Sequence, residues 1–183
     1  MADTAAHLVD RVFPEVPIRQ WVLSLPFALR YRLAYDARLV REVLHIVVQT
    51  VFGSLRSRAG FAAANRAVRC GAVTFVQRFG DALNINIHIH MLALDGVYAE
   101  DMKGRVCFHP APPPSDDEVA CVTERIRRRI AGLLERRGLG PDADCDESDT
   151  LRHSQPLLAE LYGASISGRI ATGPRAGRRI ARV

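Results

Sequence analysis

Residues 84–91 alternate strictly between polar and apolar side chains. The polar positions hold Asn84, Asn86, His88 and His90, and isoleucine or methionine follows each of them. A period of two is typical of a β-strand with one face packed inward and the other face open. We therefore expect a strand here whose open face presents two neighbouring imidazoles.

Similar patterns predict the elements around this strand. Residues 19–25 and 71–79 are β-prone, and a turn at 80–83 predicts that the second of these runs pairs with the histidine strand as an antiparallel hairpin. Another turn at Asp95-Gly96 leads into a second predicted hairpin, formed by residues 97–99 and 105–108. Residues 27–35 are ambiguous.

Two helices stand out by their apolar spacing. The first is expected from the capping residue Asp36 to about Arg58, with Gly60 closing it. The second begins at a capping box, Ser115 to Glu118, and ends at Gly138. Their predicted buried stripes are Leu39, Val40, Val43, Val47, Val51 and Leu55 in the first helix, and Val119, Val122, Ile126, Ile130 and Leu133 in the second.

These elements predict an α+β fold. It consists of an antiparallel sheet with His-x-His on a central strand and a long helix packed on one face, followed by a helical and basic C-terminal segment. The expected organisation is a metal-binding core over residues 1–108, a Pro-rich linker over 109–114, and a helical, Arg-rich segment over 115–183.

Histidines at i and i+2 of a strand suit one divalent ion, with further ligand positions left for a side chain, water or substrate. A solvated strand that carries two histidines is the plain alternative. The expected hairpin register places Gln77 on the face of His88 and His90, as a candidate third metal ligand. Asp81 is the second candidate, and an amide hydrogen bond to Asn86 is an equally good reading of Gln77.

Charge adds a candidate nucleic-acid surface. The net charge is +5, and residues 164–183 contain five arginines and no acidic residue. Guanidinium groups match phosphate oxygens, so we expect this tail to contact DNA. The expected DNA-binding residues are Arg169, Arg175, Arg178, Arg179 and Arg182.

The cysteines and the hydropathy of the chain indicate its cellular compartment. The four cysteines are scattered and form no CxxC pair, which favours reduced thiols. The N-terminus lacks the basic and apolar regions of a secretory signal, and no apolar run approaches the roughly 20 residues that span a bilayer. We expect a cytoplasmic protein without a membrane partner.

The motifs 76–80, 82–84, 88–92 and 94–98 together resemble the rolling-circle insertion-sequence (ISCR-like) transposases of the HUH class, in which HUH denotes His-hydrophobe-His. Residues 19–26 and 170–179 are similar as well. The resemblance implies that His88 and His90 hold Mg²⁺ or Mn²⁺, which polarises the scissile phosphate of single-stranded DNA. Histidine is a soft ligand for Mg²⁺, so an oxygen ligand from Gln77 or Asp81 is expected.

The resemblance also implies a tyrosine nucleophile on a helix beyond the arginine-rich tail and a Cys-rich segment before the first strand. Neither is found between Met1 and Val183. We therefore expect a truncated copy that forms no covalent adduct with DNA and at most nicks it slowly by hydrolysis. Tyr31 and Tyr35 have the spacing of a family tyrosine pair but match a different segment, so we expect packing roles for them.

The leading hypothesis is DNA transposition, with metal-dependent nicking or transesterification of single-stranded DNA. A non-catalytic DNA-binding remnant is one alternative, and an unrelated His-x-His metalloenzyme is another. Metal-dependent cleavage of single-stranded DNA separates the first two hypotheses. The basic tail argues against the third.

Overall fold

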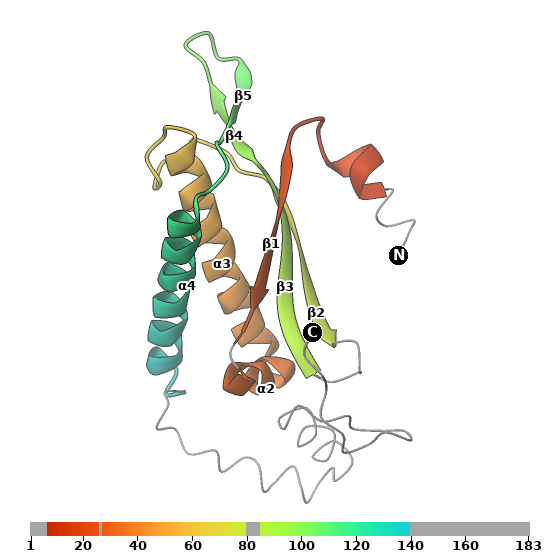
Figure 1. The fold of residues 1–183 in the computed structure, drawn as a ribbon, viewed down its shortest axis with the longest axis vertical. Coiled ribbons are helices and arrows are strands. Elements are labelled where there is room, and N and C mark those ends of the chain that lie inside the picture. The colour runs from red at the N-terminus through yellow and green to blue at the C-terminus, as the bar shows by residue number, and fades with distance from the viewer. Residues whose placement is uncertain (1–6, 26, 80–84, 140–183) are drawn as a thin grey trace, which may run out of the picture. The chain divides into compact units, whose positions relative to one another are not determined.

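The computed structural model describes residues 7–25, 27–79 and 85–139 (Figure 1). Antiparallel sheets and long helices confirm the predicted α+β class. The elements are the π-helix η1 (Leu8–Val12), the strands β1 (Ile18–Ser24), β2 (Ala72–Phe79), β3 (Ile85–Leu94), β4 (Gly96–Glu100) and β5 (Val106–Pro110), and the helices α2 (Phe27–Tyr35), α3 (Ala37–Arg58) and α4 (Asp116–Arg136).

Three strands form one sheet in the order β1-β3-β2, and β3 runs antiparallel to both neighbours (Figure 1). The connection between the edge strands β1 and β2 runs through α2 and α3. Segment 27–35, which was ambiguous in sequence, forms the helix α2. Of the described helices, none is both long enough and apolar enough to cross a membrane.

The hairpin β4–β5 departs from the expected turn at Asp95-Gly96. The chain bends at Asp95 without reversing, so β4 does not fold back on β3. It pairs with β5 as a separate two-stranded antiparallel sheet, from Gly96 opposite Pro110 to Glu100 opposite Val106. Gly96 is required at the bend, since an added Cβ would lie 2.5 Å from the carbonyl oxygen of His109.

The chain divides into two compact units, and each unit gathers segments that are distant in sequence. The division into residues 1–108, 109–114 and 115–183 stays a prediction. The first unit comprises Met1–Trp21, Gln49–Thr74 and Met91–Thr123, and the second comprises Val22–Val48, Phe75–His90 and Glu124–Val183.

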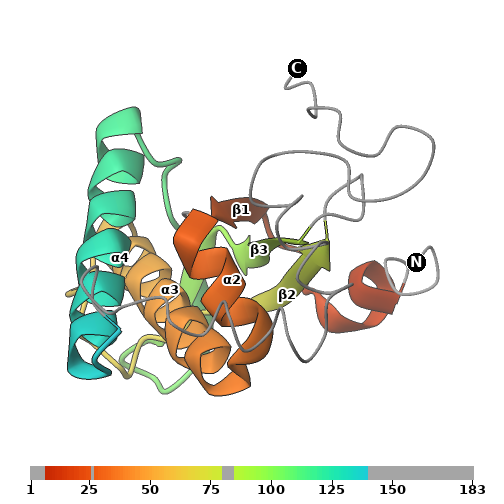
Figure 2. The same ribbon diagram turned by 90° about the horizontal axis from the view of Figure 1, so that it is seen from below.

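The core of the second unit lies between strands and helices. The described parts of α2, α3 and α4 in this unit lie on one side of its strands (Figure 2). Ile87 and Ile89 of β3 are each 2% exposed, and Leu33 of α2 and Leu39 of α3 are buried as well. The helices therefore cover the isoleucine face of β3.

Both long helices begin as their sequences predict. The Asp36 carboxylate accepts a hydrogen bond from the backbone N–H of Leu39 at 2.8 Å. Ser115 and Glu118 form the reciprocal capping box, with distances of 2.9 and 3.2 Å. The predicted stripes are buried except at Val40, which is half-buried, and Val119, which is 40% exposed.

A buried ionic cluster lies in the first unit. The Asp95 carboxylate accepts hydrogen bonds from Arg19 at 2.6–3.1 Å, and Nη1 of Arg58 lies 3.7 Å from it. The Arg58 side chain is 3% exposed and also donates to the carbonyl oxygen of Pro112. Because the backbone carbonyl oxygen of Asp95 also accepts from the N–H of Ala111, one residue joins β1, α3 and the chain after β5.

Candidate metal and nucleic-acid site

The two histidines of β3 lie side by side on the face opposite the isoleucines. Burial alternates along the strand, so that His88 and His90 are half-buried between the fully buried Ile87 and Ile89. Their ring centroids are 4.8 Å apart, with 63° between the ring planes. Two imidazoles at this separation on one strand face offer a pair of nitrogen ligands to a single ion.

The Nε2 atom of His90 is buried. A ring nitrogen screened from bulk water suits a metal ligand, and it equally suits a hydrogen-bonded imidazole. The alternation along β3 determines which face carries His88 and His90. Whether they bind a metal ion or form hydrogen bonds depends on the residues beside them.

The neighbouring strand β2 contributes the candidate oxygen ligand. Gln77 is exposed, as is Phe75 two residues before it, so both belong to the open side of β2. Asp81 lies outside the described residues. In the described part of the chain, no three His, Cys, Asp or Glu side chains form a group that could hold a metal ion. Gln77 as the third ligand therefore stays a prediction.

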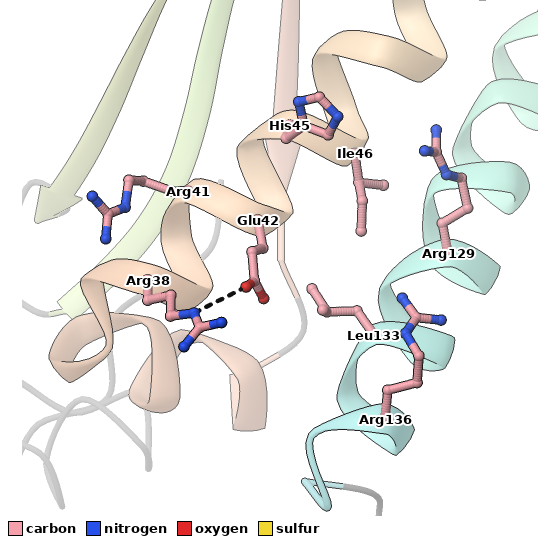
Figure 3. Close-up of a pocket in the computed structure, with 8 residues that line it drawn as sticks. All are labelled: Arg38, Arg41, Glu42, His45, Ile46, Arg129, Leu133 and Arg136. Atoms are coloured by element: carbon pink, nitrogen blue, oxygen red, sulfur yellow. Dashed lines mark hydrogen bonds and ion pairs between the residues drawn. The ribbon is translucent and has the colours of Figure 1, made fainter.

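The predicted DNA-contacting arginines of the tail, from Arg169 to Arg182, also lie outside the described residues. The structure instead reveals a basic groove between α3 and α4, with a volume of about 470 Å³. Its lining residues are Arg38, Arg41, Glu42, His45, Ile46, Arg129, Leu133 and Arg136 (Figure 3). The spacing of Arg38, Arg41 and His45 places them on one polar face of α3, but the sequence alone does not show that a second basic helix lies against this face.

The tyrosines are distributed over both units. Tyr35 is 48% exposed at the end of α2, the helix that also contains Tyr31. Tyr98 packs against Phe108 across the β4–β5 hairpin, with ring centroids 5.2 Å apart. Tyr98 therefore has a packing role in the hairpin. Tyr162 lies outside the described residues.

The described cysteines are free thiols: Cys70, Cys107 and Cys121. Burial raises the pKa of the Cys70 thiol, which disfavours the reactive thiolate. Cys145 lies outside the described residues.

Residues 71–156 match the model of a family described as "Putative transposase". The matched segment, just under half of the chain, includes His88, His90 and Gln77. No curated protein and no solved structure shows a significant match. The family match supports a transposase and suggests DNA as its partner.

Proposed function

We propose that this chain acts in DNA transposition through a divalent metal ion held by His88 and His90 on the open face of β3. The observation that supports this function is the side-by-side pair itself, with ring centroids 4.8 Å apart inside the segment that matches the transposase family. Because the isoleucine face of β3 is buried under helices, the strand is anchored and the histidines have a rigid base.

The residues present fit a weakly held Mg²⁺ or Mn²⁺ ion. Two imidazoles and the amide oxygen of Gln77 would supply three ligands and leave positions for water and phosphate oxygens. When bound, the ion would polarise a phosphodiester and stabilise the charge that develops on it. The protein's own contribution is to orient the two imidazoles and to present a surface for the nucleic acid.

Exposed apolar side chains on the strands favour single-stranded DNA as the substrate. Val22 of β1 is 56% exposed and Phe75 of β2 is 39% exposed, and the alternation of each strand turns these residues away from the helices. Unpaired bases stack on aromatic side chains, whereas paired bases in a duplex do not offer their faces. The same open face that carries the histidines therefore suits a single strand.

Metal binding is tested with a His88→Ala/His90→Ala double variant. We expect its Mn²⁺ affinity to fall by more than the roughly 10–100-fold that the loss of an outer-shell partner costs, because two ligands are lost. Titration calorimetry or water-proton relaxation measures this affinity. The matched control is His7→Ala/His45→Ala, which removes two exposed histidines and should retain wild-type affinity. Equal affinity in both variants would refute the site.

Incubation with labelled single-stranded DNA tests the reaction. We expect Mn²⁺-dependent nicking by the wild type and none by the double variant at β3. If the wild type binds the DNA and Mn²⁺ promotes no cleavage, the chain is a non-catalytic DNA-binding protein, and the enzymatic part of the proposal is wrong.

A further inference from the structure

Four of the eight residues that line the groove between α3 and α4 are arginines. In Figure 3, Ile46 and Leu133 point toward each other between the helices. Both are buried, at 7% and 8% exposure, and they form an apolar floor. The arginines come from both sides, with Arg38 and Arg41 on α3 and Arg129 and Arg136 on α4.

The single acidic residue of the groove is already neutralised. Glu42 lies 3.3 Å from Nε of Arg38 and 3.0 Å from Nε of Arg137. Arg137 also lies 2.6 Å from Asp36. Burial lowers the pKa of Arg137, but the hydrogen bonds and charges of Asp36 and Glu42 together outweigh burial and raise that pKa. The negative charge of Glu42 therefore does not offset the remaining arginines of the groove.

Two groove arginines are available to a ligand. The side chains of Arg41 and Arg136 are exposed, and no described residue forms a hydrogen bond or an ion pair with either. Arg129 and Arg136 are seven residues apart, so their Cα atoms are about 10.5 Å apart along α4. Cations repeated over this length match a chain of phosphates better than one small anion.

We propose that this groove binds the phosphodiester backbone of DNA, as a second contact surface separate from the histidine pair. Guanidinium groups match phosphate oxygens in two-pronged hydrogen bonds, and arginine is more weakly hydrated than lysine, so less water must be removed. The apolar floor places sugar edges against Ile46 and Leu133. The proposal relies on the proposed function in one respect, which is that DNA is the partner.

An acidic protein segment is the competing partner class. Carboxylates would also pair with arginines, but the match to a transposase family favours the nucleic acid. Salt dependence measures the phosphate contacts directly, because each contact releases condensed counterions from the DNA.

The test variant is Arg41→Ala/Arg136→Ala in the full chain. Its matched control is Arg11→Ala/Arg66→Ala, which removes two exposed arginines outside the groove and lowers the net charge equally. Fluorescence anisotropy with a labelled single-stranded oligonucleotide, in EDTA and over a salt series, gives the affinity and its salt slope. EDTA removes any contribution from an ion at β3.

We expect the groove variant to bind about 5-fold more weakly per lost contact at 0.1 M salt, or about 25-fold for two contacts, and its salt slope to fall by about 1.4. The control should keep the wild-type slope. Charge-retaining Arg41→Lys/Arg136→Lys should recover most of the slope. Equal losses in the groove variant and the control, or no loss in either, would overturn the proposal.

A labelled glutamate-rich peptide decides between the partner classes. If the groove variant loses affinity for the peptide and not for DNA, the groove is a protein-docking surface and the proposal is wrong. The DNA-binding test of the groove does not depend on whether the protein cleaves DNA. Absence of Mn²⁺-dependent nicking by the wild type would refute the enzymatic part of the proposed function and leave the salt slope of the groove unaffected. An equal salt slope in the wild type and the groove variant, together with metal-dependent nicking, would refute the groove alone.

Discussion

Asp95 shows how much can depend on one carboxylate. Its side chain is 10% exposed, and it faces the guanidinium groups of Arg19 and Arg58. Burial lowers the pKa of Arg58, and the nearby Asp95 opposes that effect. Nε and Nη2 of Arg58 are buried without a hydrogen-bond partner among the described residues, so Asp95 is its main electrostatic compensation.

We therefore expect Asp95→Ala to lower the free energy of unfolding by about 3–5 kcal/mol, because it leaves a buried cation uncompensated. Urea unfolding followed by circular dichroism measures the loss. The control is Arg58→Met/Asp95→Leu, which removes both charges and should lose less than the single variant. If Asp95→Ala lowers the free energy of unfolding by less than the double variant does, Asp95 does not compensate the charge of Arg58.

Residue-scale prediction from sequence succeeds where the cause is local. The alternation over residues 84–91 predicts which side chains of β3 are buried, and Ile87 and Ile89 are. It does not predict the role of Asp95, because Arg19 is 76 residues away in the chain. The Asp95-Gly96 dipeptide is typical of a turn, and the sequence does not show that its aspartate instead forms a buried ion pair.

At the scale of elements, the start of α3 combines a cap with a tertiary ion pair. The Asp36 carboxylate accepts from the N–H of Leu39 with one oxygen and lies 2.6 Å from Arg137 with the other. The hydrogen bond from Leu39, followed by the interaction with Arg137, holds the pKa of Asp36 below its usual value.

This shift has a defined consequence for stability. The folded-state pKa is depressed, so the contribution of Asp36 is present above the unfolded-state pKa of about 3.9 and is lost as the pH falls through the lower folded-state value. We expect Asp36→Asn, which keeps a capping side chain, to be less stable than the wild type at neutral pH and to match it in strong acid. Urea unfolding over a pH series gives both curves. A stability difference that is independent of pH would contradict this prediction.

Elements were predicted well where short-range signals set them. Capping boxes, apolar stripes and glycines with positive φ at Gly60 and Gly138 all act within a few residues, and the bounds of α3 and α4 follow them. The pairing of β4 with β5 was predicted and is confirmed. That the two strands form a sheet separate from β1-β3-β2 was not predicted, because it depends on the bend that Asp95 stabilises. Segment 27–35 was ambiguous because it lacks a helical stripe, and its burial at Leu29 and Leu33 is supplied by the tertiary structure.

At the scale of the whole molecule, the two faces of β3 have different roles. In the second unit, α2, α3 and α4 cover the face of β3 that carries Ile87 and Ile89 (Figure 2). The histidine pair belongs to the other face. Sequence could predict the strand and its two faces, but the basic groove depends on a tertiary contact between α3 and α4, which begin nearly eighty residues apart.

This arrangement predicts that the early tyrosines are not nucleophiles. Tyr31 and Tyr35 belong to α2, which lies on the helix-covered side of the strands, while His88 and His90 lie on the open side. A nucleophile must approach the reacting phosphorus to within about 3–3.5 Å, and a residue on the opposite face of a strand cannot do so.

We therefore expect Tyr31→Phe/Tyr35→Phe to bind Mn²⁺ and to nick single-stranded DNA as the wild type does. Denaturing gels with labelled DNA measure nicking and also reveal any covalent protein–DNA adduct as a shifted band. The His88→Ala/His90→Ala variant serves as the inactive control. If the tyrosine double variant loses an adduct that the wild type forms, α2 must reach the open face during the reaction, and the separation of the two faces described above would not hold in solution.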